Sequence, residues 1–146
     1  MTFPTTDNKT NKEAISIFTD GASRGNPGPA ASAFVILQND LILFNESFYL
    51  GIQTNNQAEY QAIIKALQKV KEYTEGSVIV HSDSELVIKQ LNGDYRVNKP
   101  HLKFFRDEIF KLKKEFTDVK FEHVLRKHKW IKYVDKLCNQ NLNRNS

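Results

Sequence analysis

The sequence predicts an α/β fold in which a mixed five-stranded sheet is flanked by helices. Three β-rich stretches come first, and strand-like and helix-like patterns alternate after them. Strands joined by a short turn pair antiparallel, whereas strands joined through a helix usually pair parallel with a right-handed crossover. We therefore expect an antiparallel meander of three strands, followed by strands that pair parallel. The 146 residues suffice for one domain with its own core, but not for two ordinary ones.

The first three strands are predicted from alternating residues with high β propensity. Residues 14–19, 31–38 and 41–50 have this pattern. Asn39 and Asp40 separate the second and third stretches, and a two-residue link of this kind is typical of a hairpin turn. The three stretches therefore predict the meander.

Apolar periodicity, helix caps and breakers predict the later elements. Thr54 and Asn55 can each cap a helix, Gly93 closes a short one, and Pro100 opens the next. The predicted order is a helix at 54–73, a strand at 77–84, a short helix at 84–93, a helix at 100–116, a strand at 118–125 and a helix at 133–142.

The charge of the chain is unevenly distributed. The net charge is +4 and the pI is about 9.1. Between residues 99 and 136 there are 12 Lys or Arg residues and six acidic ones. A basic half of this kind fits a nucleic-acid partner, but it also fits a solvated helix face, and charge alone does not decide between them.

Composition also bounds the compartment and the domain organisation. The single cysteine, Cys138, excludes an internal disulfide and a cysteine-based metal site. No apolar run approaches the roughly 20 residues that span a bilayer, and the polar N-terminus lacks the apolar core of a secretory signal. We therefore expect a cytoplasmic monomer with no membrane contact. Residues 1–12 are expected to form a disordered tail, and residues 13–146 a single domain.

Four acidic residues occupy positions that one edge of the sheet can bring together. Asp20 ends the first predicted strand, before the turn-forming sequence GASRGNPG, and Asp83 lies at the C-terminal end of the fourth. Parallel strands place their C-terminal ends together, so these two carboxylates are expected to be neighbours. Glu59 lies one turn into the first helix, and Asp135 lies at the start of the last one. A lone aspartate on a buried strand is costly to desolvate without a partner, which favours one shared site.

Clustered carboxylates of this kind call for cations, because like charges raise each other's pKa. Oxygen ligands without cysteine or clustered histidine suit hard cations, Mg²⁺ first and Mn²⁺ second. Two such ions, about 3.5–4 Å apart, activate water and stabilise the leaving oxygen during an in-line attack on phosphorus. The alternative for each acid taken singly is a helix cap, a turn residue or a surface charge.

The segments that carry these acids resemble type 1 ribonuclease H in sequence and in order. They are FTDGASRGNPGPA, TNNQAEYQAIIKAL, HSDSELVIKQLNG and DKLCNQNL, of which the first three are specific together. The resemblance implies an RNase H-like fold and cleavage of the RNA strand of RNA–DNA hybrids to 3′-hydroxyl and 5′-phosphate ends. It also implies two Mg²⁺ ions, with Mn²⁺ as a possible substitute, bound by Asp20, Glu59, Asp83 and Asp135.

The same resemblance implies the substrate contacts. Asn26, Asn55 and Asn56 match positions that contact the minor groove of the hybrid, and amides suit 2′-hydroxyls and base edges because they both donate and accept. Thr54 matches a position near a phosphate of the DNA strand. Glu85 stands where many relatives carry a neutral residue next to the RNA. For Asn55, a helix cap is an alternative role.

The chain also departs from the family pattern. It lacks the basic handle that some bacterial members insert after the short helix, and we expect no separate hybrid-binding domain before the core. We expect weaker binding, or binding through Arg96, Lys99, Lys103 and Arg106.

The segment before Asp135 is the second departure. His128 matches a loop histidine that moves protons and releases product in the family, and a surface or phosphate-contacting role is the alternative. The extra residues there, among them Trp130, leave open a catalytically weak protein that binds hybrid or duplex RNA. Double-stranded RNA is a possible side substrate. Asp20 is followed by Gly21-Ala22, so Ala22 stands where an Asp-x-Glu pattern has its glutamate, which argues against a proofreading-type exonuclease.

Overall fold

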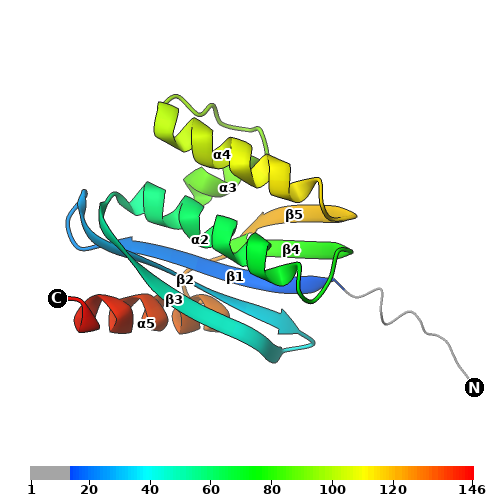
Figure 1. The fold of residues 1–146 in the computed structure, drawn as a ribbon, viewed down its shortest axis with the longest axis horizontal. Helices are drawn as coiled ribbons and strands as arrows, with labels where there is room; N and C mark the ends of the chain where they lie inside the picture. The colour runs from blue at the N-terminus through cyan, green and yellow to red at the C-terminus, as the bar shows by residue number, and fades with distance from the viewer. Residues whose placement is uncertain (1–13) are drawn as a thin grey trace, which may run out of the picture.

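The computed structural model describes residues 14–146, which form a sheet covered by helices (Figure 1). The elements are β1 (Ile15–Ser23), β2 (Gly28–Gln38), β3 (Leu41–Gln53), α2 (Asn55–Val70), β4 (Ser77–Ser82), α3 (Glu85–Leu91), α4 (Pro100–Lys113), β5 (Asp118–His123) and α5 (Lys129–Arg144). The tail predicted at residues 1–12 lies outside the described residues, as does residue 13 of the predicted domain.

The five strands lie in the order β3-β2-β1-β4-β5. The β1–β2 and β2–β3 pairs are antiparallel, whereas the β1–β4 and β4–β5 pairs are parallel. Asn39 and Asp40 link β2 to β3 with φ angles of 53° and 64°, as the predicted two-residue turn requires. The predicted mixed sheet is therefore confirmed.

The strands of the meander are longer than the sequence pattern predicts. β1 continues through Asp20, because β2 pairs with it as far as Ser23 opposite Ala30. The prediction that this strand ends at Asp20 is therefore wrong. The parallel ladder between β1 and β4 does end before Asp20, at Phe18 opposite His81. Asp20 thus lies on a strand that is paired on one side only.

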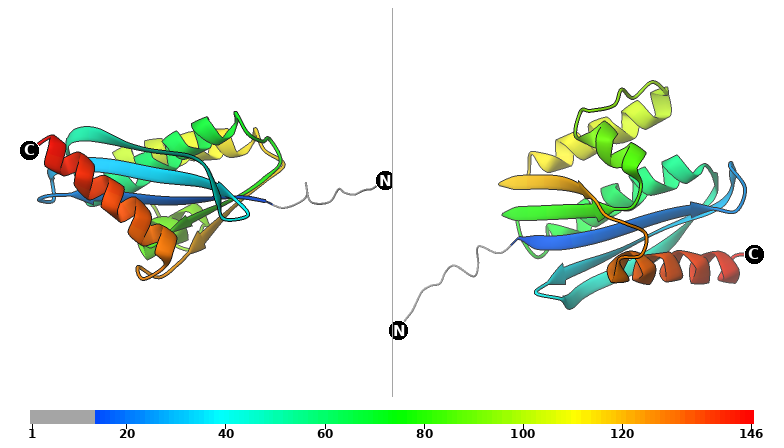
Figure 2. Two further views of the ribbon diagram at one scale, coloured as in Figure 1. Left: turned by 90° about the horizontal axis from the view of Figure 1, so that it is seen from below. Right: turned by 180° about the vertical axis from the view of Figure 1, so that it is seen from behind.

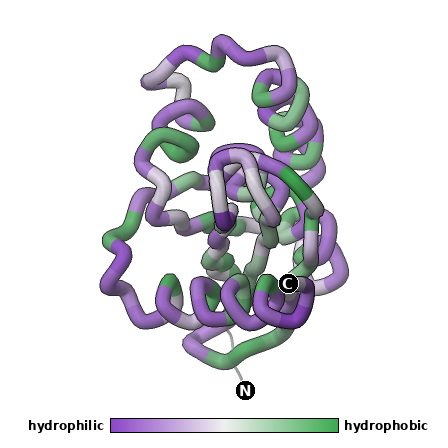
Figure 3. Tube along the Cα trace, turned by 90° about the vertical axis from the view of Figure 1, so that its left-hand side faces the viewer, coloured by the Kyte–Doolittle hydropathy of each residue, from purple (hydrophilic) through white to green (hydrophobic). Residues whose placement is uncertain are grey.

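Helices cover both faces of the sheet (Figures 1 and 2). α2 packs on β1 and β2, and α5 packs on the opposite face against β1, β2 and β3. α4 packs against α2, and α3 lies near β5. The helices carry both hydrophobic and hydrophilic stretches in Figure 3, as amphipathic helices do. Within residues 14–146, no helix combines the length and the apolar character needed to cross a membrane.

Both faces of β1 are buried, and this fixes its register. Ile17 belongs to the larger hydrophobic cluster on the α2 side, with Phe34, Tyr60 and Leu67. Its neighbour Phe18 belongs to the smaller cluster on the α5 side. A slip of one residue would exchange these two faces, so the packing determines where Asp20 lies along the strand.

Candidate active site

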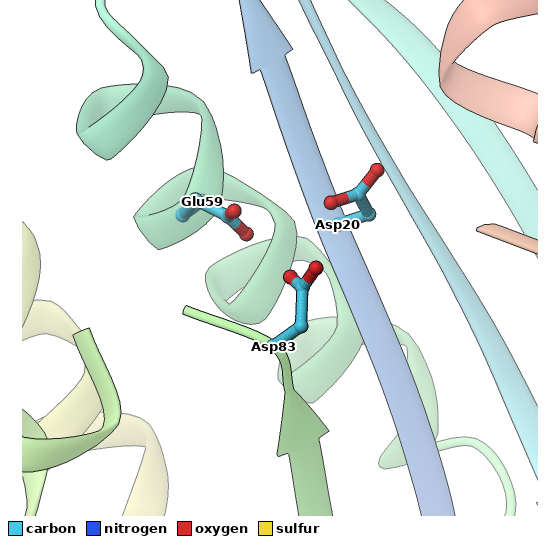
Figure 4. A group of neighbouring side chains, drawn as sticks. All are labelled: Asp20, Glu59 and Asp83. Atoms are coloured by element: carbon cyan, nitrogen blue, oxygen red, sulfur yellow. The ribbon is translucent and has the colours of Figure 1, made fainter. Parts of the chain in front are cut away.

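Three of the four predicted carboxylates meet where β1 passes the end of β4 (Figure 4). Asp20 lies on β1, Glu59 lies one turn into α2, and Asp83 directly follows β4. Each offers an oxygen atom, and these atoms lie within 4.8 Å of one another. Asp20 is only 7% exposed and Glu59 only 8%. The group is therefore compact and largely shielded from water.

The parallel pairing of β1 with β4 brings the two aspartates to the same level. The last pair of this ladder is Phe18 with His81, and each aspartate lies two residues further along its chain. The rings of Phe18 and His81 stack 4.2 Å apart with 7° between their planes, so both side chains leave the same face. Side chains two residues apart on a strand share a face, so Asp20 leaves β1 on the same face as Phe18. Asp83, just beyond the end of β4, lies at the same level.

Gly21 allows α2 to approach β1 closely enough for Glu59 to join them. A Cβ atom added at Gly21 would lie 2.4 Å from the carbonyl carbon of Ala58 and 2.4 Å from the amide nitrogen of Glu59. Thr54 fixes the start of the same helix, because its side chain accepts a hydrogen bond from the Gln57 amide. The Gln57 side chain accepts one from the Thr54 amide in return, which completes a capping box.

Burial and mutual repulsion favour the protonated forms of Asp20 and Glu59 when no cation is bound. Burial, followed by the charges of Asp83 and Asp135, raises the pKa of Asp20 from 3.8 to about 8. Burial and then the charges of Asp20 and Asp83 raise the pKa of Glu59 well above 4.5. The Oε1 atom of Glu59 is buried and has no hydrogen-bond partner among the described residues. An unpartnered buried oxygen is costly, and a bound cation would satisfy it.

This donor set therefore fits a hard divalent cation. Asp20, Glu59 and Asp83 offer only carboxylate oxygens, the ligand type that such ions prefer. A bound cation would also favour the ionised carboxylates, which burial disfavours.

Asp135 lies beside this group rather than within it. It is exposed on α5, and the three oxygens within 4.8 Å of one another do not include its own. It is nevertheless close enough to Asp20 to raise the pKa of that carboxyl group. The Nδ2 atom of Asn139 donates to the Asp135 carbonyl at 3.1 Å and to its carboxylate at 3.4 Å. Arg24 in turn donates to Asn139, so the turn after β1 helps to hold this part of α5.

Arg126 is a site residue that the sequence analysis did not identify. Its Nε atom lies 3.2 Å from Oδ2 of Asp83, and it lines the carboxylate cavity of about 340 Å³. The Asp83 charge raises the pKa of Arg126 further above its usual value. The available signal was topological: β5 runs parallel to β4, so the loop after β5 reaches the edge of the sheet where β4 ends.

His128 does not line the carboxylate cavity in this structure. Its Nδ1 atom accepts a hydrogen bond from the Trp130 amide and caps α5, which is why this helix begins earlier than predicted. Its ring packs on Phe18, with 4.7 Å between ring centroids. The Trp130 indole donates to Asp40 in the β2–β3 turn at 3.2 Å. The catalytic role of His128 stays a prediction, and the residue that contacts a carboxylate is Arg126.

Two of the predicted substrate contacts also hold the backbone around the site. Oδ1 of Asn26 accepts from the Asn55 amide at 3.0 Å, and Oδ1 of Asn55 accepts from the Ser23 amide at 2.7 Å. These bonds fasten the turn after β1 to the start of α2. Asn55 and Asn56 line the carboxylate cavity.

Thr54 and Glu85 lie further from the carboxylates. Thr54 is the N-cap of α2, so the alternative weighed for Asn55, a helix cap, belongs to its neighbour. Glu85 is exposed in the first turn of α3, 3.5 Å from the Lys89 ammonium group, and does not line the carboxylate cavity.

Known proteins resemble this chain in sequence and in fold. A family model described as reverse transcriptase-like matches residues 18–141. The crystal structure of RNase H1 from the halophilic archaeon Halobacterium salinarum superposes with a TM-score of 0.84 and 37% identity, over 90% of this chain and 99% of that one. This chain belongs to the ribonuclease H family.

A curated sequence and a second solved structure extend the comparison. The curated ribonuclease HI of H. salinarum is 40% identical over 113 residues, which are 77% of this chain and 57% of that protein. The chain therefore spans little more than half the length of this curated ribonuclease H. LC11-RNase H1, solved in complex with an RNA/DNA hybrid, gives a TM-score of 0.84 at 36% identity, over 90% of this chain and 98% of that one.

Proposed function

We propose that this chain is a metal-dependent endoribonuclease that hydrolyses the RNA strand of RNA–DNA hybrids. Water supplies the oxygen that joins phosphorus, the bond from phosphorus to the 3′ oxygen breaks, and that oxygen takes a proton. The products are a 5′-phosphate and a 3′-hydroxyl end. The observation that carries the proposal is the buried group of three carboxylates with an unpartnered Glu59 oxygen.

We assign metal binding to Asp20, Glu59 and Asp83, and a supporting position at the edge of the site to Asp135. Two Mg²⁺ ions, with Mn²⁺ as a substitute, would supply an activated water and stabilise the leaving oxygen. Asp20 and Glu59 are buried, so a cation that binds them would be shielded from bulk water on the protein side. Arg126 supplies a positive charge at the same edge of the sheet. This charge reduces the electrostatic repulsion between the carboxylates and an approaching phosphate.

The asparagines beside the carboxylates suit the minor groove of a hybrid. The carbonyl oxygens of Asn26 and Asn55 are occupied by backbone amides, so the amino group of each side chain remains to donate. Donors at this place match the 2′-hydroxyls and the acceptor atoms of base edges in the groove. The hybrid bound by LC11-RNase H1 supports this substrate for the present chain. We further propose a monomer, with double-stranded RNA as a weaker substrate.

A cleavage assay tests the proposal. An end-labelled RNA–DNA hybrid is incubated with Mg²⁺, Mn²⁺ or EDTA, beside single-stranded RNA, duplex RNA and duplex DNA. We expect metal-dependent cutting of the RNA strand by the wild type and none by Asp20→Asn. Hybrid binding without cutting under either metal would contradict the enzyme and favour a binding protein of the same fold.

A further inference from the structure

A second cavity of about 420 Å³ adjoins the carboxylates. We call it the basic cavity, and its lining residues are Asp83, Arg126, Lys127, Ile131, Lys132 and Asp135. Three of these, Asp83, Arg126 and Asp135, also line the carboxylate cavity, so the two hollows are direct neighbours. One extended ligand can therefore occupy both.

The two cavities differ in charge. Asp20 and Glu59 lie only in the carboxylate cavity, and Lys127 and Lys132 lie only in the basic one. Arg126 is paired with Asp83. Both lysines are exposed, and within residues 14–146 neither ammonium group has a carboxylate within 4.0 Å. Their positive charge is available to an anion that enters from solvent.

We propose that the basic cavity binds the backbone phosphate adjacent to the scissile one, on the strand that is cut. This inference rests on the proposed function, because it takes the scissile phosphate to lie at the carboxylates. A strand with one phosphate there continues to both sides. The neutral amides of Asn55 and Asn56 line the carboxylate cavity itself, whereas the adjoining basic cavity offers the two lysines. Because the cavities share a wall, the continuous strand reaches the lysines before the opposite strand can.

A lysine that contacts one phosphate has two measurable effects. Its loss weakens binding by about two- to fivefold, as for an exposed ion pair. Each lost phosphate contact also makes the plot of log binding constant against log salt concentration shallower, by about 0.7–0.9. A lysine that is merely solvated changes neither quantity beyond the effect of net charge.

The test uses the full chain with Asp20→Asn, so that binding is measured without cleavage. Lys132→Ala and Lys127→Ala are added separately, and the Kd for an RNA–DNA hybrid is measured across a series of salt concentrations. Lys136→Ala is the matched control, since Lys136 lies one turn further along α5, is exposed and does not line the basic cavity. We expect Lys132→Ala and Lys127→Ala to weaken binding and flatten the salt dependence, and Lys136→Ala to do neither. Equal effects of all three variants would overturn the proposal.

Uncharged methylphosphonate linkages then identify the strand. Each is placed singly, beside the scissile bond in the RNA strand or at the facing position in the DNA strand. A methylphosphonate at one RNA position should weaken hybrid binding by the Asp20→Asn parent protein. The same linkage should cause no further loss of affinity in the Lys132→Ala variant, because the contact to that phosphate is already missing. The assignment would be refuted if the loss of affinity from Lys132→Ala and the loss from each methylphosphonate were additive at every position. It would also be refuted if a DNA-strand linkage, rather than an RNA-strand one, caused no further loss in Lys132→Ala. If the wild type cuts no hybrid yet these binding results hold, the proposed enzymatic function fails, and Lys127 and Lys132 are retained only as contacts to a backbone phosphate of the bound RNA strand.

Discussion

Replacing Asp20 by asparagine should abolish cleavage and at the same time stabilise the metal-free protein. The pKa of Asp20 rises from 3.8 to about 8 on folding, chiefly through burial. The folded state therefore holds this proton more tightly than the unfolded state does. The associated stability is present in full below pH 3.8 and is lost as the pH rises toward 8. At one pKa unit per about 1.4 kcal/mol, the loss reaches about 4 kcal/mol at pH 7.

Asparagine has nearly the same shape and does not ionise, so the variant escapes this loss. Because its amide is still polar and buried, we expect a gain of about 2–4 kcal/mol in unfolding free energy at pH 7–8 in EDTA, and little gain at pH 4. For a chain of this size, the melting temperature should rise by roughly 5–15 °C. Urea denaturation followed by circular dichroism, at pH 4, 6 and 8, measures the gain and its pH dependence.

The matched control for this experiment is Asp118→Asn, at an exposed carboxylate on β5. Its stability should change by no more than about 0.5 kcal/mol at any of these pH values. Added Mg²⁺ should make the wild type more stable than Asp20→Asn, because the ion binds the folded wild type and stabilises it by mass action. An Asp20→Asn protein that is no more stable than the wild type at pH 8 in EDTA would refute the reasoning. A gain of equal size at pH 4 and pH 8 would refute it as well.

Substitutions at three further positions test the geometry around the carboxylates. Gly21→Ala should cost at least about 3 kcal/mol of unfolding free energy in urea denaturation, because the new methyl group would meet the backbone at Glu59, and a well-tolerated alanine would contradict that close approach. Asn26→Asp keeps the acceptor for the Asn55 amide but loses the donor and adds a charge; stability should hold while hybrid affinity falls about tenfold in a titration, and unchanged affinity would show that this amide does not face the substrate. His128→Ala should cost about 0.5–2 kcal/mol through loss of the α5 cap, whereas His128→Asn retains an acceptor. If cleavage rates fall equally in both His128 variants, the ring takes part in the reaction; a rate restored by asparagine assigns it to capping.

The sheet topology could be predicted because each local pattern agrees with it. Alternation and the Asn39-Asp40 turn specify the meander, and the helical segments between the later strands specify parallel pairing. The pairing of β1 with β2 beyond Asp20 could not be predicted from local sequence patterns. Residues after Asp20 have turn-forming composition, and only the neighbouring strand keeps Gly21 and Ser23 extended.

The three central carboxylates could be predicted because strand ends and a helix turn locate them. Arg126 and His128 lie in a loop, where sequence spacing does not determine distance. The side chain of His128 is committed to capping α5 and packing on Phe18. Tertiary contacts of this kind decide that Arg126, and not His128, reaches Asp83. These contacts cannot be inferred from the charge of a residue or from its position in the sequence.

The hydrogen bond between the Trp130 indole and Asp40 gives this molecule an intrinsic fluorescent reporter. The chain contains one tryptophan, and its indole joins the β2–β3 turn to the first turn of α5, next to the loop that carries Arg126. Any rearrangement of that loop when metal or nucleic acid binds changes the surroundings of a single fluorophore. When it is excited selectively over the five tyrosines, its emission can therefore be followed in stopped-flow mixing on the unlabelled wild-type chain, and the signal comes from one known place at the start of α5.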